Sequence, residues 1–318
     1  MKFERTKPGR ITPLRAGTAR LRMTCGAVLA AVLLAVVAAA PARAEGGRRY
    51  ALLVGVQFYE AKSNLRELKY TEHDVEELAQ VLQASGWHPD NIVLMTQSLG
   101  ARQLRFLPTG ENIRRELNLL LSDLEPTDTL LVAFSGHGIH LSKEKQSYFC
   151  PIDADLKNPA TLIALESLYQ SLKSCRAGHK ILLCDACRDD PALGGAKRPE
   201  VALESLTRPE LDAAKGSAAF FSCSPGEVSY EHEDLKHGVF FHSVIDGLSG
   251  KADLDKDSEI SLLELEFFVR KNVTDFVRAR FGVKQRPEML RQGNDVFPLL
   301  ALPGQSGAPA ESPDSSRR

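Results

Sequence analysis

Apolar residues between about positions 50 and 280 follow two patterns. Short continuous apolar runs predict buried strands, and apolar residues that recur at i, i+3, i+4 and i+7 predict helices packed by one face. Strands are expected over 50–56, 91–97, 129–138, 180–187 and 217–224, and helices over 71–85, 109–124, 165–175, 239–248 and 262–280. We expect Thr71 to cap the first helix and Gly86 to end it. Buried strands alternating with amphipathic helices predict an α/β fold, a mainly parallel sheet with helices on both faces.

The two ends of the chain differ from this central part. A basic stretch over residues 1–22 is followed by an apolar run to Ala40 and by Ala-Arg-Ala at 42–44. This order is typical of a secretory signal peptide cut after Ala44. The apolar run from Cys25 is shorter than the roughly 20 residues that span a bilayer, which makes an uncleaved anchor the weaker alternative. We therefore expect an exported protein, periplasmic or secreted, without a stable membrane span.

Removing residues 1–44 changes the composition of what remains. The whole chain has 40 Lys and Arg against 41 Asp and Glu, and the first 44 residues hold eight and one of them. The remainder has 32 Lys and Arg against 40 Asp and Glu, a net charge near −8. This negative charge argues against a nucleic-acid partner and suits a cationic ligand. We expect one domain over 45–302 and a disordered tail, rich in Pro, Ser and Gly, over 303–318.

Five cysteines follow the signal segment: Cys150, Cys175, Cys184, Cys187 and Cys223. Exported proteins commonly pair their cysteines in disulfides. An odd number leaves at least one thiol unpaired, and such a thiol is a candidate for reactivity.

Two of the predicted strands end in reactive side chains. One strand ends in SGHG at 135–138, which contains His137, and another ends in DAC at 185–187, which contains Cys187. Sites in parallel α/β sheets form at the carboxyl ends of the strands, so these two side chains are expected to be neighbours. A histidine beside a cysteine can generate the thiolate that acts as a nucleophile.

These motifs resemble those of the caspase-like cysteine peptidases. Caspases carry Gln-Ala-Cys with a histidine about 50 residues upstream, and here Asp-Ala-Cys places Cys187 50 residues after His137. An aspartate two positions before the cysteine is similar to metacaspases and their bacterial relatives, the orthocaspases. The resemblance covers roughly 48–298 and includes ALLVGVQFY, LKYTEHDVEELAQVL, FCPIDA and SCSPGEVSYE.

The resemblance implies a three-layer caspase-like fold with a six-stranded, mainly parallel sheet. It implies that Cys187 is the nucleophile and His137 the general base, and that the backbone N–H groups of Gly138 and Cys187 form the oxyanion hole. No cofactor is required by this chemistry.

Substrate specificity is predicted from charge. The resemblance places Asp185 and Asp74 beside the pocket for the residue before the scissile bond. Glu231 stands where caspases carry an arginine that binds substrate aspartate. Three carboxylates predict cleavage of protein or peptide substrates after Arg or Lys. Alternatively, Asp185 could cap the turn after its strand, Asp74 could be a first-turn charge that interacts with the helix dipole, and Glu231 could have a structural role.

The irregular segment 189–216 is where caspase relatives are often cut during activation. It contains Lys197, Arg198, Arg208 and Lys215, and each arginine precedes a proline. Peptide bonds before proline generally resist hydrolysis, so self-cleavage is expected after Lys197 or Lys215.

An acidic loop between the last two predicted helices matches a calcium-binding EF-hand loop. Ser258 replaces the glycine usual at its sixth position, which strains the turn. An Asx-turn loop that caps the next helix is the alternative. The candidate calcium ligands are Asp253, Asp255, Asp257, Glu259, Ser261 and Glu264.

Three other interpretations carry less weight. Cys184 and Cys187 have the C-x-x-C spacing of redox motifs, but Cys184 lies inside an apolar run and is expected in the sheet core. The histidines at 137 and 140 and at 232, 237 and 242 lack a matching spacing of zinc ligands. A caspase-like module that binds partners without catalysis remains the main alternative, since a disulfide to Cys187 would silence the thiol.

Overall fold

The computed structural model describes residues 47–141, 146–186, 216–224, 227–291 and 298–302. All of them belong to one unit, Gly46–Arg318. Cys187, Lys197 and Lys215 lie outside the described residues, as do the predicted signal peptide and the tail. None of the helices in these ranges combines the length and the apolar character needed to cross a membrane.

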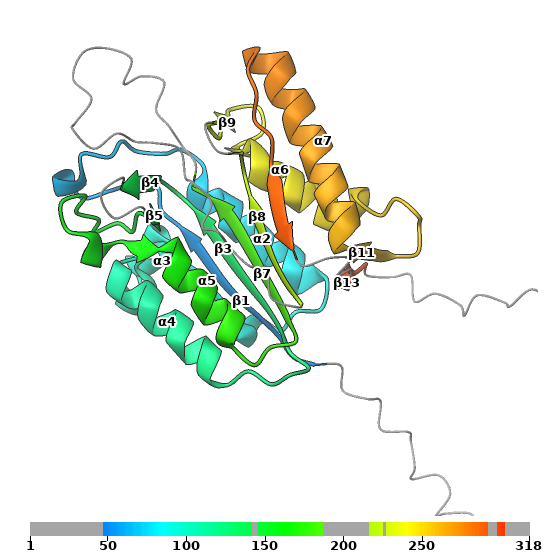
Figure 1. The fold of residues 1–318 in the computed structure, drawn as a ribbon, viewed down its shortest axis with the longest axis horizontal. Coiled ribbons are helices and arrows are strands. Elements are labelled where there is room, and N and C mark those ends of the chain that lie inside the picture. Colours follow the sequence, from blue (N-terminus) through cyan, green and yellow to red (C-terminus); the bar gives the residue numbers. More distant parts are fainter. Residues whose placement is uncertain (1–46, 142–145, 187–215, 225–226, 292–297, 303–318) are drawn as a thin grey trace, which may run out of the picture. The chain divides into compact units, whose positions relative to one another are not determined.

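A six-stranded sheet runs through the centre of the described residues (Figure 1). Its strand order is β12-β8-β7-β3-β1-β2; β12 is antiparallel to β8, and the other neighbours are parallel. The mainly parallel sheet is confirmed, whereas the edge strand β12 was not predicted because its residues show neither a continuous apolar run nor a clear alternation. The bounds are β1 Arg49–Gly55, β2 Ile92–Met95, β3 Thr129–Ser135, β7 His179–Asp185, β8 Ser217–Phe221 and β12 Glu288–Arg291.

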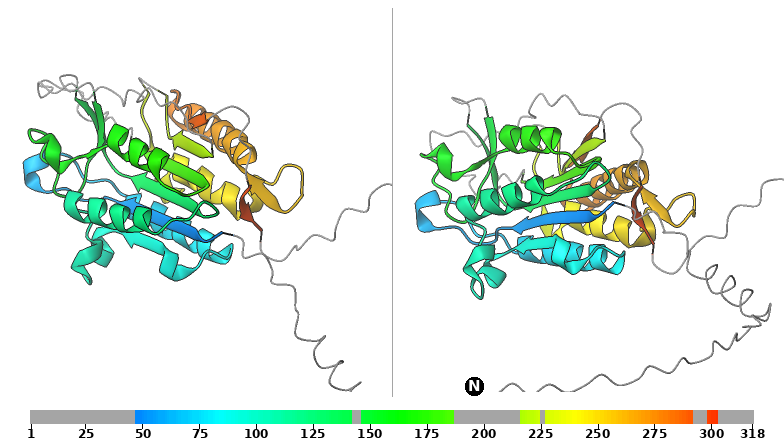
Figure 2. Two further views of the ribbon diagram at one scale, coloured as in Figure 1. Left: turned by 60° about the horizontal axis from the view of Figure 1, so that its bottom comes forward. Right: turned by 90° about the horizontal axis from the view of Figure 1, so that it is seen from below.

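Helices cover both faces of this sheet, which confirms the predicted three-layer α/β class. Helices α4 and α5 lie on one face, and α2, α6 and α7 lie on the other (Figures 1 and 2). The five longer helices correspond to the five predicted ones, with ends that differ by one or two residues. The bounds are α2 Thr71–Ala84, α3 Gln97–Gly100, α4 Gly110–Ser122, α5 Leu165–Ser174, α6 Val239–Asp246 and α7 Leu262–Phe281.

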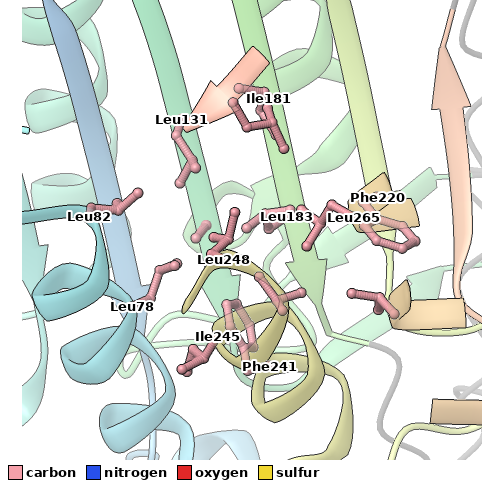
Figure 3. Packing of buried hydrophobic residues seen from close by; sticks show 14 of the residues in the cluster. Leu78, Leu82, Leu131, Ile181, Leu183, Phe220, Phe241, Ile245, Leu248 and Leu265 are labelled. Atoms are coloured by element: carbon pink, nitrogen blue, oxygen red, sulfur yellow. The ribbon is translucent and has the colours of Figure 1, made fainter. Parts of the chain in front are cut away.

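Successive residues of the central strands point into two separate cores. In β7, Ile181 and Leu183 pack on the side of α2, α6 and α7, and Leu182 and Cys184 pack on the side of α4 and α5. Figure 3 shows the first of these cores, where Ile181 and Leu183 lie with apolar side chains of α2 and α6. Because both faces are buried, every position must be apolar, which produces the continuous runs in the sequence.

Short elements that were not predicted surround the main sheet. A three-stranded sheet contains β4 Gly138–Leu141, β5 Gln146–Phe149 and β6 Ile163–Ala164. A two-stranded sheet pairs β9 Glu231–His232 with β10 His237–Gly238. Another pairs β11 Glu259–Ser261 with β13 Pro298–Ala301. The 3₁₀-helices are η1 Ala61–Ser63, η2 Pro89–Asn91, η3 Leu104–Phe106 and η4 Pro159–Thr161, and η6 Gly247–Lys251 is a π-helical turn.

Two details of the sequence interpretation were wrong. Tyr70, not Thr71, precedes α2, and the Thr71 hydroxyl is buried with no hydrogen-bond partner among the described residues. The strand expected over 129–138 ends at Ser135, and the chain turns before β4 begins at Gly138. Gly86 follows the end of α2 in a left-handed conformation, φ +84°, as a terminating glycine does.

Candidate active site

Three neighbouring strands end together at one edge of the sheet. Gly55 of β1 is in register with Ser135 of β3, which is in register with Asp185 of β7. An added Cβ at Gly55 would lie 2.5 Å from the backbone oxygen of Thr71, so glycine lets the first turn of α2 pack directly on β1. This carboxyl edge therefore gathers the start of α2, the turn that bears His137 and the strand that precedes Cys187.

His137 is held by backbone and hydroxyl groups. It is buried, with 4% of its surface exposed, and its backbone N–H donates to the Tyr59 hydroxyl over 2.7 Å. The Tyr59 hydroxyl in turn donates to the Val56 carbonyl, and the Tyr59 and His137 ring centroids lie 5.1 Å apart. The turn after β3 is thus fastened to the segment after β1.

The imidazole of His137 has a defined tautomer. Its Nε2 lies 3.0 Å from the backbone oxygen of Arg66. A carbonyl oxygen can only accept a hydrogen bond, so Nε2 carries a proton. In the neutral ring the basic nitrogen is then Nδ1.

Gly138 brings the His137 turn against the end of β7. A Cβ added at Gly138 would lie 2.1 Å from the backbone oxygen of Ala186, so only glycine permits this approach. Ala186 is the residue before Cys187, and the histidine turn is thus packed on the chain segment that leads to the cysteine.

The amide of Gly138 is directed away from the small sheet. The Cys150 amide donates to the His137 carbonyl, and Gly138 is paired with Phe149 in the antiparallel ladder. Hydrogen-bonded and non-hydrogen-bonded pairs alternate in such a ladder, so the Gly138–Phe149 pair is of the second type. The Gly138 N–H therefore points away from β5, as an oxyanion donor must.

Asp74 and Asp185 flank Ser135 beneath this edge. Both carboxylates are fully buried, and the Ser135 hydroxyl donates to Asp74 over 2.7 Å. Register partners in neighbouring parallel strands point to the same face, so Asp185 faces the α2 side next to Ser135. Asp74 also accepts from the Gly238 amide and from His237. Asp74 lies in the first turn of α2, where the helix dipole favours a negative charge.

Glu231 interacts with backbone amides at the start of α2. Its two carboxylate oxygens accept hydrogen bonds from the backbone N–H groups of Lys69 and Tyr70, each over 3.0 Å. These contacts connect β9 to the segment before α2 and give Glu231 a structural role at that segment.

Sequence reasoning missed three contributors to this edge: Arg66, Tyr59 and Ser135. The Arg66 contribution is a backbone oxygen, which any residue type provides and no motif can reveal. Tyr59 and Ser135 lie within stretches that the family resemblance included, but their partners are distant in sequence. A polar serine at the end of an apolar strand was the single available signal.

The described cysteines are not joined to one another. Cys150, Cys184 and Cys223 are buried and Cys175 is half-buried, and no disulfide joins any two of these four. Burial in apolar surroundings raises the pKa of the Cys150 thiol far above its ordinary value, so this thiol is inert at neutral pH. The C-x-x-C interpretation cannot rest on Cys184, which packs in the sheet core as expected.

The acidic loop brings three of the predicted calcium ligands together. Carboxylate oxygens of Asp253, Asp255 and Asp257 lie within 4.8 Å of one another. Ser258 adopts a left-handed conformation, φ +70°, at the position where EF-hand loops carry glycine. Glu264 caps α7, since it accepts from the amide and hydroxyl of Ser261 and from the Leu254 amide. Burial raises the pKa of Glu264, but these hydrogen bonds outweigh it and the pKa is lowered.

Comparison with known proteins agrees with this geometry. A caspase-domain family model matches residues 48–297. Metacaspase-1 of Candida albicans is 35% identical over 102 residues, 32% of this chain and 22% of that protein. Metacaspase-1 of Meyerozyma guilliermondii is 36% identical over 93 residues, 29% of this chain and 22% of that protein. These matches span about a fifth of the length of the relatives.

Solved structures share the fold at low sequence identity. Caspase-1 from Spodoptera frugiperda superposes with a TM-score of 0.53 and 16% identity, covering 83% of this chain and 93% of that one. A protein of Geobacter sulfurreducens superposes with a TM-score of 0.54 and 14% identity, covering 76% of this chain and 92% of that one. The family match over most of the described residues, the fold and the strand-end motifs agree: the chain belongs to the caspase-domain family of cysteine peptidases.

Proposed function

We propose that this protein is a cysteine endopeptidase in which Cys187 is the nucleophile and His137 the general base. The observation that carries the proposal is the contact between Gly138 and Ala186, which brings the His137 turn to the residue before Cys187. His137 Nδ1 takes the thiol proton, and Cys187 Sγ attacks the substrate carbonyl. The N–H groups of Gly138 and Cys187 stabilise the oxyanion. The imidazolium then protonates the leaving amine, and water hydrolyses the thioester.

The residue before the scissile bond is proposed to be Arg or Lys. Asp74 and Asp185 place two buried carboxylates on one side of the sheet, separated by the Ser135 hydroxyl. A buried guanidinium forms short charge-assisted hydrogen bonds with such a pair. The Thr71 hydroxyl, buried beside Asp74 in the first turn of α2, is a further polar group available to a substrate cation.

Turnover of reporter peptides tests both parts of this proposal. Peptides that differ only in Arg, Lys or Asp before the reporter are assayed with and without calcium, and beside Cys187→Ala. We expect turnover after Arg and Lys, lost in Cys187→Ala. Preferred turnover after Asp would contradict the pocket assignment. No turnover in any condition favours a binding module without catalysis, the alternative function.

Self-processing is proposed after Lys197 or Lys215, in a protein exported through its first 44 residues. Intact mass spectrometry of the purified protein beside Cys187→Ala tests the cleavage. We expect two fragments whose masses sum to the chain plus one water, absent from the variant. Identical masses in the two samples would contradict self-processing.

Calcium binding by the acidic loop is proposed as a property separate from the chemistry. Asp253 Oδ1 is buried and has no hydrogen-bond partner within the described ranges, so a cation bound beside Asp255 and Asp257 would satisfy it. Glu259, Ser261 and Glu264 complete the predicted set. Calorimetric titration with calcium should give heat that Asp253→Ala loses; equal heats in both proteins would eliminate the site.

A further inference from the structure

A group of histidines and carboxylates lies on the outer side of α2, where β10 packs against it. His73 and Glu77 occupy positions i and i+4 of α2, and His237 comes from β10, 160 residues after Glu77. The His73 and His237 rings are stacked with centroids 4.3 Å apart. His237 is buried, whereas about half of the His73 side chain and 39% of the Glu77 side chain are exposed.

Hydrogen bonds fix the orientation of both imidazoles. His237 Nδ1 lies 2.9 Å from the buried Asp74 carboxylate, and His73 Nδ1 lies 2.9 Å from the Lys236 carbonyl. Carboxylate and carbonyl oxygens accept, so both Nδ1 atoms carry protons. The other nitrogen of each ring, Nε2, can bind a metal once it has lost any proton that it carries.

Both Nε2 atoms lie near one carboxylate. Glu77 Oε2 lies 2.7 Å from His237 Nε2 and 3.8 Å from His73 Nε2. The three potential ligand atoms lie within 4.8 Å of one another. Ligand atoms around a tetrahedral Zn²⁺ are roughly 3.3 Å apart, so small rotations of the two exposed side chains would complete the geometry.

We propose that His73, Glu77 and His237 form a binding site for a divalent transition-metal ion such as Zn²⁺. Two imidazole nitrogens and one carboxylate are a donor set that selects Zn²⁺ and its neighbours over Ca²⁺ or Mg²⁺. The ligating histidines have the outer contacts that orient metal-bound imidazoles: a carboxylate behind His237 and a backbone carbonyl behind His73.

A hydrogen bond joins two of the proposed ligands when the metal is absent, since His237 Nε2 lies 2.7 Å from Glu77 Oε2. The ring also faces His73 from α2 and His242 from α6. Metal and proton therefore compete for His237 Nε2.

This site could not be predicted from the sequence, because residue spacing reveals metal ligands only when they are close together in the chain. The histidines after residue 230 lack a matching partner nearby, and the partner is supplied by α2. The site reaches the candidate active site through Asp74, which accepts from His237 on one oxygen and from Ser135 on the other. Metal binding itself does not depend on the proposed peptidase activity.

Titration of the full chain with Zn²⁺ and with Co²⁺ tests the proposal. The parent protein carries Cys187→Ala, which removes the thiol as a competing ligand, and the buffer contains excess calcium to fill the acidic loop. We expect one Zn²⁺ per chain by calorimetry, and visible Co²⁺ absorption bands of a nitrogen- and oxygen-ligated site. His73→Ala and Glu77→Gln should each weaken binding by at least about tenfold.

Controls distinguish loss of ligands from loss of structure. His73 and Glu77 are partly exposed, so their variants should keep the circular dichroism spectrum of the parent. His88→Ala changes an exposed histidine with a neighbouring carboxylate beyond the other end of α2, and it should bind as the parent does. The absence of binding, or equal affinity in the parent, His73→Ala and Glu77→Gln, would overturn the proposal.

Discussion

Two buried histidines of this protein have different partners. His137 is oriented by the neutral backbone oxygen of Arg66 and by Tyr59, whereas His237 lies between the carboxylates of Asp74 and Glu77. A carbonyl fixes which nitrogen donates, which suits the proposed role of His137 as a base. Two carboxylates stabilise a positive charge, whether a proton or a metal ion carries it. His137 and His237 are the same type of residue and both are buried, so the charge of the partner distinguishes their proposed roles.

The largest effect is expected from removing the proposed base. His137→Ala should lower kcat for an Arg reporter peptide by about 10³-fold, since general base catalysis contributes roughly 10² to 10⁴. Steady-state kinetics checks this, with His88→Ala as the control. Activity within tenfold of the parent would mean that His137 is not the base.

A smaller effect is expected from neutralising one carboxylate of the proposed pocket. Asp185→Asn keeps the shape of the buried side chain and should lower kcat/KM for Arg peptides by about 100-fold, since loss of a buried charge partner costs about 2–5 kcal/mol. Asp123→Asn, an exposed carboxylate just beyond α4, should have no effect. Equal loss for substrates with Arg and with a neutral residue would show that Asp185 acts through structure alone.

Tyr59→Phe should have a modest effect on the same reaction. The change retains the ring beside His137 but removes the hydroxyl that accepts from the His137 amide and donates to Val56. We expect kcat to fall about threefold to tenfold and stability to fall by about 1 kcal/mol. Kinetics and urea unfolding measure the two effects, and unchanged kinetics would remove Tyr59 from the positioning of His137.

The smallest effect concerns the pH dependence of stability around His237. Because its pKa is raised in the folded state, its charged form contributes stability that is fully present below about pH 6.5 and is lost as the pH rises through the folded value. The groups facing it are Asp74, Glu77, His73 and His242. Glu77→Gln removes one of the charges that raise the pKa of His237, so it should reduce this loss of stability.

Urea midpoints between pH 5.5 and 8.5, with a chelator present, measure that difference. Asp90→Asn, which changes an exposed carboxylate beside another histidine, is the matched control. Parallel pH profiles for the parent and Glu77→Gln would show that Glu77 does not stabilise the charged form of His237.

Much of the fold was predictable because buried parallel strands leave a plain signal. Each strand of the β2-β1-β3-β7-β8 part of the sheet was expected, since both faces are covered and continuous apolar runs result. Strand β12 and the small sheets at β4–β6, β9–β10 and β11–β13 were missed. They are short or lie at edges, and their pairing partners are set by tertiary contacts.

The site was predictable in part for the same reason. His137 and Asp185 follow or end strong apolar strands, so their position at the carboxyl edge could be inferred. The Arg66 carbonyl and the Tyr59 hydroxyl could not, because a backbone oxygen has no residue signature and the Tyr59 contact joins segments 78 residues apart.

The sequence by itself determined the fold class, the family and the residues that bear the proposed chemistry, since apolar periodicity and the His–Cys spacing are local properties of the chain. Tertiary structure alone decided which partner each histidine meets. Electrostatic and hydrogen-bond contacts act over a few ångströms in space, whatever the separation in sequence. Asp74 shows the difference: it was predicted as a pocket carboxylate, and the fold also makes it the hydrogen-bond partner of His237, 163 residues away.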